Sequence, residues 1–207
     1  MKKTLLTAGF FFTLLFAFAQ KPVQVGDCTI IYSIAGDGNS ANKDLSDAAK
    51  TVYVKGKMIR SDAVSPTYNQ TILYNGNDGT AVILQQSGAE KYMTKFSAED
   101  WKEKNKRYEG STASFSNETK TILTYECKKA TVTLKDGSNF VVYYAPGIST
   151  MIQENPFQFK DIPGIVLQYT LTDEGKSITY TAIKLNFNPV PAMKFEIPAA
   201  GYRVLKP

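Results

Sequence analysis

Short segments rich in β-branched and aromatic residues make up most of this chain, and glycine-containing turns separate them. The clearest turn is Asn-Gly-Asn-Asp-Gly at residues 75–79, which lies between two apolar segments and predicts a β-hairpin. Most of the connections are too short for a parallel crossover, which needs about a dozen residues. The sequence therefore predicts a mainly antiparallel sheet.

The expected strands share this composition and number about ten, enough for one sheet to curl. They cover residues 29–35, 51–60, 70–74, 80–85, 90–96, 120–127, 130–134, 139–145, 165–172 and 177–187, with a last short strand at 193–197.

A helix is expected at residues 98–107. Ser97 is a natural N-cap, Asp100 stands at the acidic position of a capping box, and basic residues follow late in the segment. We expect Trp101 to face the sheet. A weaker helix is expected at 44–50, and the proline-containing segment 146–163 is expected to cover one face or edge of the sheet. The basic cluster Lys102, Lys104, Lys106 and Arg107 is interpreted as a solvated helix face, with a binding patch for an anionic partner as the alternative.

Segments 81–84 and 140–144 are apolar at successive positions, so both faces of these strands need cover. A flat sandwich would supply it. So would a curved sheet whose concave side is filled by a helix and loops, or by an apolar ligand. In segment 51–59, by contrast, Val52, Val54 and Met58 alternate with polar residues and are expected to share one face.

The first nineteen residues have the pattern of a signal peptide. Lys2 and Lys3 precede an apolar run that ends in Ala17-Phe18-Ala19, which predicts cleavage before Gln20 and export of residues 20–207 as a single domain. An uncleaved anchor is the alternative. Without Lys2 and Lys3 the chain has 22 basic and 19 acidic residues, a net charge of +3. So mild a charge suits an exported protein and gives no reason to expect a nucleic-acid partner. The signal peptide predicts a periplasmic or secreted protein with no transmembrane segment after cleavage.

The chain contains no histidine, which excludes a Ser-His-Asp triad, a Cys-His pair and an imidazole metal site. The acidic residues lie mostly in turns or on the polar helix face, where solvation explains them. We therefore expect no enzymatic activity, no metal and no cofactor.

Cys28 and Cys127 are the two cysteines, and neither directly follows the signal peptide as a lipid-modified cysteine would. In an oxidising compartment they form a natural disulfide pair. Two buried, unpaired thiols that pack as small apolar residues are the equal alternative.

Three segments resemble a family of exported domains. Residues 119–130, TKTILTYECKKA, are similar to the TKTI-x-GY-x-C-x-KA stretch of the GLPGLI-type domains of Bacteroidetes-like bacteria, although Thr124 replaces the usual glycine. Residues 161–167, DIPGIVL, resemble the namesake motif, with Asp161 and Ile162 in place of Gly and Leu. Residues 52–62 resemble the YVKG-x-K-x-R-x-D stretch of related domains. In the second motif, Pro163-Gly164 is expected to form a turn in which glycine permits a positive φ.

The resemblance implies the half-barrel fold of the LolA/LolB lipoprotein carriers. That fold is mainly β (α+β), a single strongly curved antiparallel sheet with one or two helices on its concave side. It implies affinity for a lipid or another apolar small molecule.

Two functions follow: a periplasmic carrier for an apolar ligand, or an envelope module that docks a protein partner and has a solid core. For the carrier, strand parity selects nine residues that could line an apolar cavity or else pack as core. They are Val52, Val54, Met58, Phe140, Val142, Tyr144, Ile165, Leu167 and Tyr169.

Overall fold

The computed structural model describes residues 22–36, 48–173 and 175–207. The expected signal peptide and its cleavage site lie outside these residues. So does most of the helix expected at 44–50. Its last two residues, Ala49 and Lys50, are strand, so the helix prediction is wrong there.

The first half of the chain forms a meander of antiparallel hairpins. Its strands are β2 (Asp27–Gly36), β3 (Ala49–Lys55), β4 (Met58–Val64), β5 (Tyr68–Asn75), β6 (Ala81–Ser87) and β7 (Glu90–Phe96). The hairpin expected at residues 75–79 is confirmed, because this turn joins β5 to β6.

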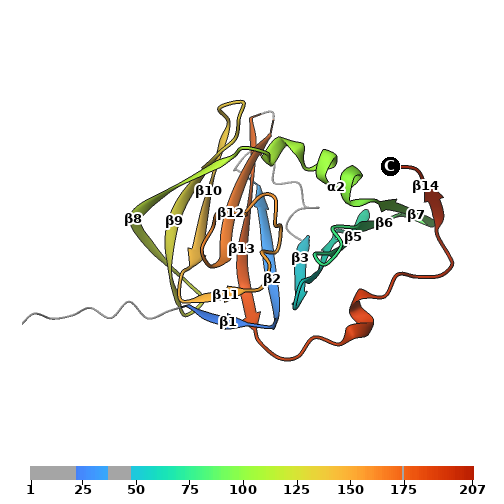
Figure 1. Cartoon of the computed structure of the whole chain (residues 1–207), viewed down its shortest axis with the longest axis horizontal. Coiled ribbons are helices and arrows are strands. Elements are labelled where there is room, and N and C mark those ends of the chain that lie inside the picture. Colours follow the sequence, from blue (N-terminus) through green and yellow to red (C-terminus); the bar gives the residue numbers. More distant parts are fainter. Residues whose placement is uncertain (1–21, 37–47, 174) are drawn as a thin grey trace, which may run out of the picture.

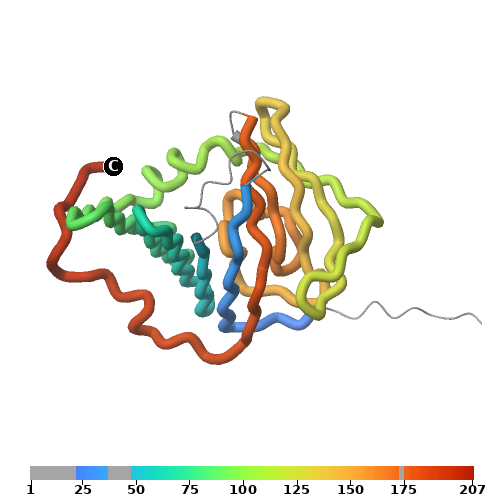
Figure 2. Tube along the Cα trace, turned by 180° about the vertical axis from the view of Figure 1, so that it is seen from behind, coloured from blue at the N-terminus to red at the C-terminus, as the bar shows by residue number. Residues whose placement is uncertain are grey.

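The second half forms another antiparallel meander. Its strands are β8 (Thr112–Ile122), β9 (Tyr125–Thr133), β10 (Asn139–Ala145), β12 (Ile165–Asp173) and β13 (Lys176–Asn186). β13 returns beside β2 and pairs with it, as Figures 1 and 2 show. The two meanders thereby become one sheet in the order β14-β7-β6-β5-β4-β3-β2-β13-β12-β10-β9-β8. The prediction of a mainly β, mostly antiparallel fold is confirmed, with twelve strands in this sheet among the described residues.

Two short pairs of strands are parallel. β1 (Val23–Val25) pairs with β11 (Ile148–Thr150), and β14 (Arg203–Leu205) pairs with β7. Between β13 and β14 the chain passes around the outside of the molecule (Figure 1) and forms the 3-10 helix η2 (Ala192–Phe195). The strand expected at 193–197 is therefore wrong: this segment packs by burying Phe195, and it does not pair with the sheet.

Two expected strands are in fact hairpins. Segment 51–60 bends at Gly56, whose φ of 56° is left-handed, and so divides into β3 and β4. Segment 120–127 bends at Leu123, with a φ of 55°, and divides into β8 and β9. Because of the bend at Gly56, the prediction that Val52, Val54 and Met58 share one face is wrong for Met58. Val54 pairs with Ile59, so Met58, one residue earlier in β4, lies on the opposite face from Val52 and Val54.

The helix α2 (Ala98–Lys104) begins as expected. The Ser97 hydroxyl accepts a hydrogen bond from the Asp100 backbone, and the Asp100 carboxylate accepts one from the Ser97 backbone. α2 ends earlier than expected, and the 3-10 helix η1 (Lys106–Tyr108) follows it. Trp101 is buried and packs against Phe96 and Tyr74, which confirms that it faces the sheet.

One face of the sheet, called here the core face, carries most of the buried side chains. Cross-strand pairing places Ile30, Val52 and Ser61 on it, and continues it through Ile72 to Ile83 in β6. Segment 146–163 covers the middle of this face, as predicted, and α2 covers the β6–β7 end.

The prediction that 81–84 needs cover on both sides is confirmed, because all four residues are buried. Ala81 and Ile83 lie under Trp101 on the core face. Val82 and Leu84 form a separate cluster on the opposite face, against which Tyr202 from the C-terminal segment packs.

Cys28 and Cys127 are both free and buried, so the prediction of a disulfide is wrong and the alternative of two buried, unpaired thiols is confirmed. The reason is the order of the strands. Cys28 lies in β2 and Cys127 in β9, four positions apart in the sheet. Strands are spaced by about 4.8 Å, which makes about 19 Å along the sheet. A disulfide needs its two Cα atoms within about 7 Å. Burial raises the pKa of the Cys28 thiol to about 12 and that of Cys127 to about 11.

Gly164 is required for a reason other than the expected one. Its φ is not positive. Instead, the backbone passes so close to β10 that a Cβ on Gly164 would overlap the carbonyl oxygen of Ala145 and lie 2.8 Å from its carbonyl carbon. The glycine of this motif therefore permits close packing at the start of β12.

Candidate ligand-binding site

A pocket of about 380 Å³ lies at one end of β10, β12 and β13. Figure 1 shows α2 leading toward this end of the strands. η1, which follows α2, contributes Arg107 and Tyr108 to the lining. Ligand pockets in proteins measure about 300–1,000 Å³, so this one has room for one small ligand.

The apolar wall of this pocket belongs to the core face. Leu171 in β12 pairs with Ile178 in β13, and two residues further along the same face Tyr169 pairs with Tyr180. Leu171, Ile178 and Tyr180 line the pocket together with Phe140. The opening is therefore a part of the core face that segment 146–163 leaves uncovered.

Of the nine residues predicted to line a cavity, Phe140 is the one that lines this pocket. Met58 lines a different pocket of about 250 Å³ on the opposite face, beside Phe195. Seven others are at most 4% exposed and belong to the main core cluster. They are Val52, Val54, Val142, Tyr144, Ile165, Leu167 and Tyr169.

What sequence reasoning missed is the contribution of Leu171 and Ile178, which flank the turn between β12 and β13. Ile178 stands among polar residues in the sequence Lys-Ser-Ile-Thr-Tyr, and its pairing with Leu171 is the feature that identifies it. Leu171 follows Leu167 and Tyr169 at the same parity. Extending the predicted set by two residues would have found it.

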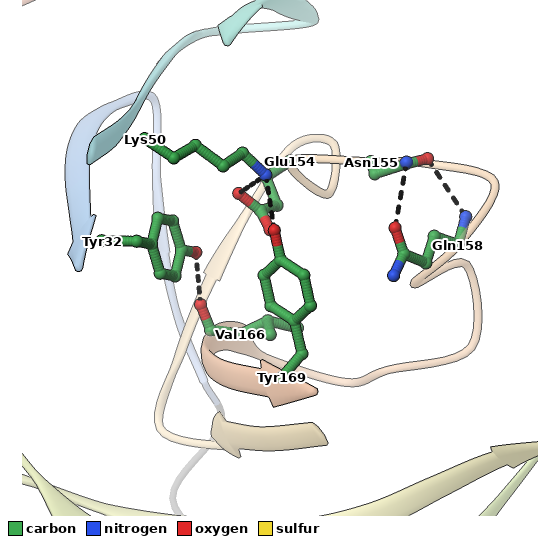
Figure 3. Close-up of polar contacts among 7 residues, drawn as sticks. All are labelled: Tyr32, Lys50, Glu154, Asn155, Gln158, Val166 and Tyr169. Carbon is green, nitrogen blue, oxygen red and sulfur yellow. Dashed lines mark hydrogen bonds and ion pairs between the residues drawn. The ribbon is translucent and has the colours of Figure 1, made fainter. Parts of the chain in front are cut away.

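Beside the pocket, a polar cluster lies on the core face (Figure 3). Lys50 Nζ donates hydrogen bonds to Glu154 Oε2 at 3.3 Å and to the Tyr169 hydroxyl at 2.8 Å. The same nitrogen lies 5.2–5.7 Å from the ring centroids of Tyr32, Tyr169 and Tyr180. Tyr32 itself donates to the backbone carbonyl of Val166 at 2.7 Å.

Glu154 is the most deeply buried charged group of this cluster. Its side chain is 2% exposed, and Oε1 makes no hydrogen bond with any described residue. Burial raises the pKa of the Glu154 carboxyl, and the Lys50 ammonium opposes this rise. The pair thus joins β3 to segment 146–163, which covers the core face.

The polar cluster and the pocket share a wall. The rings of Tyr169 and Tyr180 stack with centroids 4.6 Å apart and an interplanar angle of 10°. The Tyr169 hydroxyl accepts a hydrogen bond from the Lys50 ammonium, and Tyr180 lines the pocket. Burial raises the pKa of both phenols, so they remain neutral at physiological pH. The wall is therefore an uncharged aromatic surface.

The described residues contain no group of three or more His, Cys, Asp or Glu side chains placed to hold a metal ion. Across the same part of the chain, no helix has both the length and the apolar character needed to cross a membrane.

No model of a known protein family matches the chain, and no curated protein matches it either. The resemblance to GLPGLI-type domains therefore stays a prediction.

Several solved structures are similar to this one, and PNGF-II and LppX are two of them. The structure of PNGF-II has a TM-score of 0.49 and 13% sequence identity, and the similarity covers 87% of this chain and 31% of that one. This chain thus spans about a third of the PNGF-II chain. The crystal structure of the Mycobacterium tuberculosis lipoprotein LppX has a TM-score of 0.35 and 14% identity, covering 81% of this chain and 89% of that one. Neither similarity assigns a function to this chain.

Proposed function

We propose that this protein is an exported, non-catalytic binding protein that carries a small apolar ligand, such as one acyl chain, in the 380 Å³ pocket. The observation that carries the proposal is the half-buried apolar wall that Leu171, Ile178 and Tyr180 form on the core face. Removing apolar surface from water is the main driving force for binding such a ligand, at about 25 cal/mol per Å².

The proposal includes a half-barrel curvature of the sheet. Its support is the way in which segment 146–163 contacts distant strands. The Phe157 ring lies 6.2 Å from that of Tyr74 in β5, and the Phe159 ring lies 6.3 Å from that of Phe140 in β10. These strands are six positions apart in the sheet, whereas the two phenylalanines are two residues apart. A sheet that wraps around the segment would account for both contacts.

Export is the second part of the proposal and rests on the signal-peptide pattern of residues 1–19. The motif resemblance to GLPGLI-type exported domains agrees with it. N-terminal sequencing of protein from the cell envelope should begin at Gln20, whereas a sequence beginning at Met1 would contradict this part.

Binding is tested with an environment-sensitive apolar dye and its displacement by dodecanol, a neutral single-chain ligand. We expect the folded protein to bind the dye and Ile178→Asp to abolish this binding, because a carboxylate would then lie in the apolar wall. Ile183→Asp is the matched control, since Ile183 lies in the same strand and is 57% exposed. Circular dichroism checks that both variants fold, and Leu171→Ala supplies a milder variant. A folded wild-type protein that binds neither dye nor dodecanol would overturn the proposal.

Docking of an envelope protein is a second candidate, favoured by one observation. β8 is an edge strand of eleven residues, most of which are exposed, and Phe115 in it is 53% exposed. Edge strands of this kind can accept a strand from a partner. Ser116→Pro removes a backbone N–H from this edge and should therefore weaken such pairing. Loss of a cross-linked envelope partner in Ser116→Pro, with dye binding unchanged, would support docking, and an unchanged cross-link would contradict it.

A further inference from the structure

The basic cluster at the end of α2 divides into residues with different partners. Lys106 pairs with Glu103 at 3.0 Å, and Lys102 lies 3.9 Å from Glu109. Lys104 lies over the Phe96 ring. Arg107 differs, because its guanidinium contacts the Tyr108 ring and forms no ion pair with a described residue.

Arg107 lines the 380 Å³ pocket from η1, and Lys176 lines it from the start of β13. Both side chains belong to exposed residues, and neither forms an ion pair with any side chain that the structure describes. Among the side chains that the structure describes, no acidic one lines the pocket. The nearby Asp136 carboxylate accepts hydrogen bonds from Ser138, which lower its pKa, and the Arg107 charge adds to this effect.

The pocket therefore has two chemically distinct parts. Its wall is apolar, and its lining includes two cations together with the neutral polar residues Ser138, Asn139 and Thr172. Guanidinium and ammonium groups form their strongest hydrogen bonds with carboxylate and phosphate oxygens. A ligand with an apolar chain and an anionic end would match both parts.

We propose that the ligand is a single-chain amphiphile with an anionic headgroup, a carboxylate or a phosphate, which Arg107 and Lys176 bind. This proposal rests on the proposed function, because it takes the same pocket as the binding site. It also gives a role to one member of the basic cluster, whereas the other three behave as the solvated helix face that their pattern predicts.

The experiment compares four ligands with the same twelve-carbon chain, each at a concentration at which it is dissolved as monomers. They are dodecanoate, dodecyl phosphate, neutral dodecanol and cationic dodecyltrimethylammonium. A charge-assisted hydrogen bond is expected to change the dissociation constant by about tenfold. One or both anions should therefore bind at least about tenfold more tightly than dodecanol, and the cation should bind most weakly. Added salt should weaken the binding of anions but not that of dodecanol.

The variant Arg107→Gln/Lys176→Gln should lose about tenfold or more in affinity for the anions and keep its affinity for dodecanol. Lys102→Gln/Lys104→Gln is the control. It removes the same charge from residues that do not line the pocket, so it should bind all four ligands as the wild type does.

The outcomes separate the two proposals. If dodecanol binds as tightly as both anions, or if Arg107→Gln/Lys176→Gln keeps its affinity for anions, the headgroup proposal is overturned and the apolar binding function stands. If no ligand with this chain binds to the folded protein, both proposals are overturned.

Discussion

Lys50 Nζ lies 3.3 Å from Glu154 Oε2, and this buried ion pair joins β3 to the segment that covers the core face. The two side chains are 15% and 2% exposed. Taking two charges out of water is costly, and their attraction offsets this cost only while both are present. Replacing either side chain alone would therefore leave the other as a buried charge without a counter-charge.

Removing the Lys50 cation alone should destabilise the protein more than replacing Lys50 and Glu154 together. We expect Lys50→Met to lower the free energy of unfolding by about 3–5 kcal/mol at neutral pH, because the Glu154 carboxylate is then buried without a counter-charge. Lys50→Met/Glu154→Gln should cost less than Lys50→Met alone. Urea denaturation measures both. A loss below about 1 kcal/mol for Lys50→Met would contradict the assigned pairing.

The same variants should differ in their pH dependence. The folded-state pKa of Glu154 is raised above its usual 4.5, so the native state holds more protons than the unfolded state between these two values. Stability is therefore fully present below about pH 4.5 and decreases as the pH rises through the folded-state pKa.

Lys50→Met removes the cation that opposes this rise, so the loss should extend to higher pH. The difference between wild type and Lys50→Met should be small at about pH 4 and large at about pH 8. Lys50→Met/Glu154→Gln has no carboxyl at this position, so its own stability should lack this pH-dependent loss. A constant difference for Lys50→Met would show that Glu154 does not titrate as described.

Gly164→Ala should destabilise the protein by about 1–3 kcal/mol, since the new Cβ would collide with the backbone of Ala145. The control is Gly147→Ala, where a Cβ would meet nothing within 4 Å and φ is not left-handed. Thermal unfolding should show no loss for the control. Equal stabilities of the two variants would argue against the close approach of β12 to β10.

Leu123→Gly should stabilise the hairpin between β8 and β9 by about 0.5–1 kcal/mol. A left-handed conformation costs a non-glycine residue about 1–2 kcal/mol, and glycine removes this strain. Part of the gain is lost because glycine gives the unfolded chain more conformational entropy. Leu123→Ala keeps the strained φ and should give no gain. A gain for alanine that equals the gain for glycine would show that relief of backbone strain is not the cause.

Both thiols should resist alkylation in the folded protein at about pH 8, because burial raises their pKa values to about 12 for Cys28 and about 11 for Cys127. After denaturation without reductant, intact mass should show two added alkyl groups. A mass with no added groups under these conditions would indicate a bond between the cysteines.

Local features of the sequence were enough to predict several elements. The turn at 75–79, the strand β7 and the capping box of Ser97 and Asp100 are all found where expected. Each depends on residues that are neighbours in the chain. The hairpin at Gly56 was missed because the alternation of apolar residues in 51–59 continues across the bend. β8 was missed at its start because its residues are mostly polar and exposed.

By itself, the amino-acid sequence determined the strand-rich, antiparallel character of this protein, the start of its helix and the need to cover both faces of β6. These follow from turn chemistry and from side-chain periodicity, which act over a few residues. Only the tertiary structure decided that Cys28 and Cys127 lie in strands four positions apart, that Lys50 meets Glu154, and that Arg107 and Lys176 line the same pocket. Each of these depends on the pairing of β13 with β2, which joins the two meanders across more than a hundred residues of chain. The energies that select such a pairing come from burial of the whole core face and leave no local signal in the sequence.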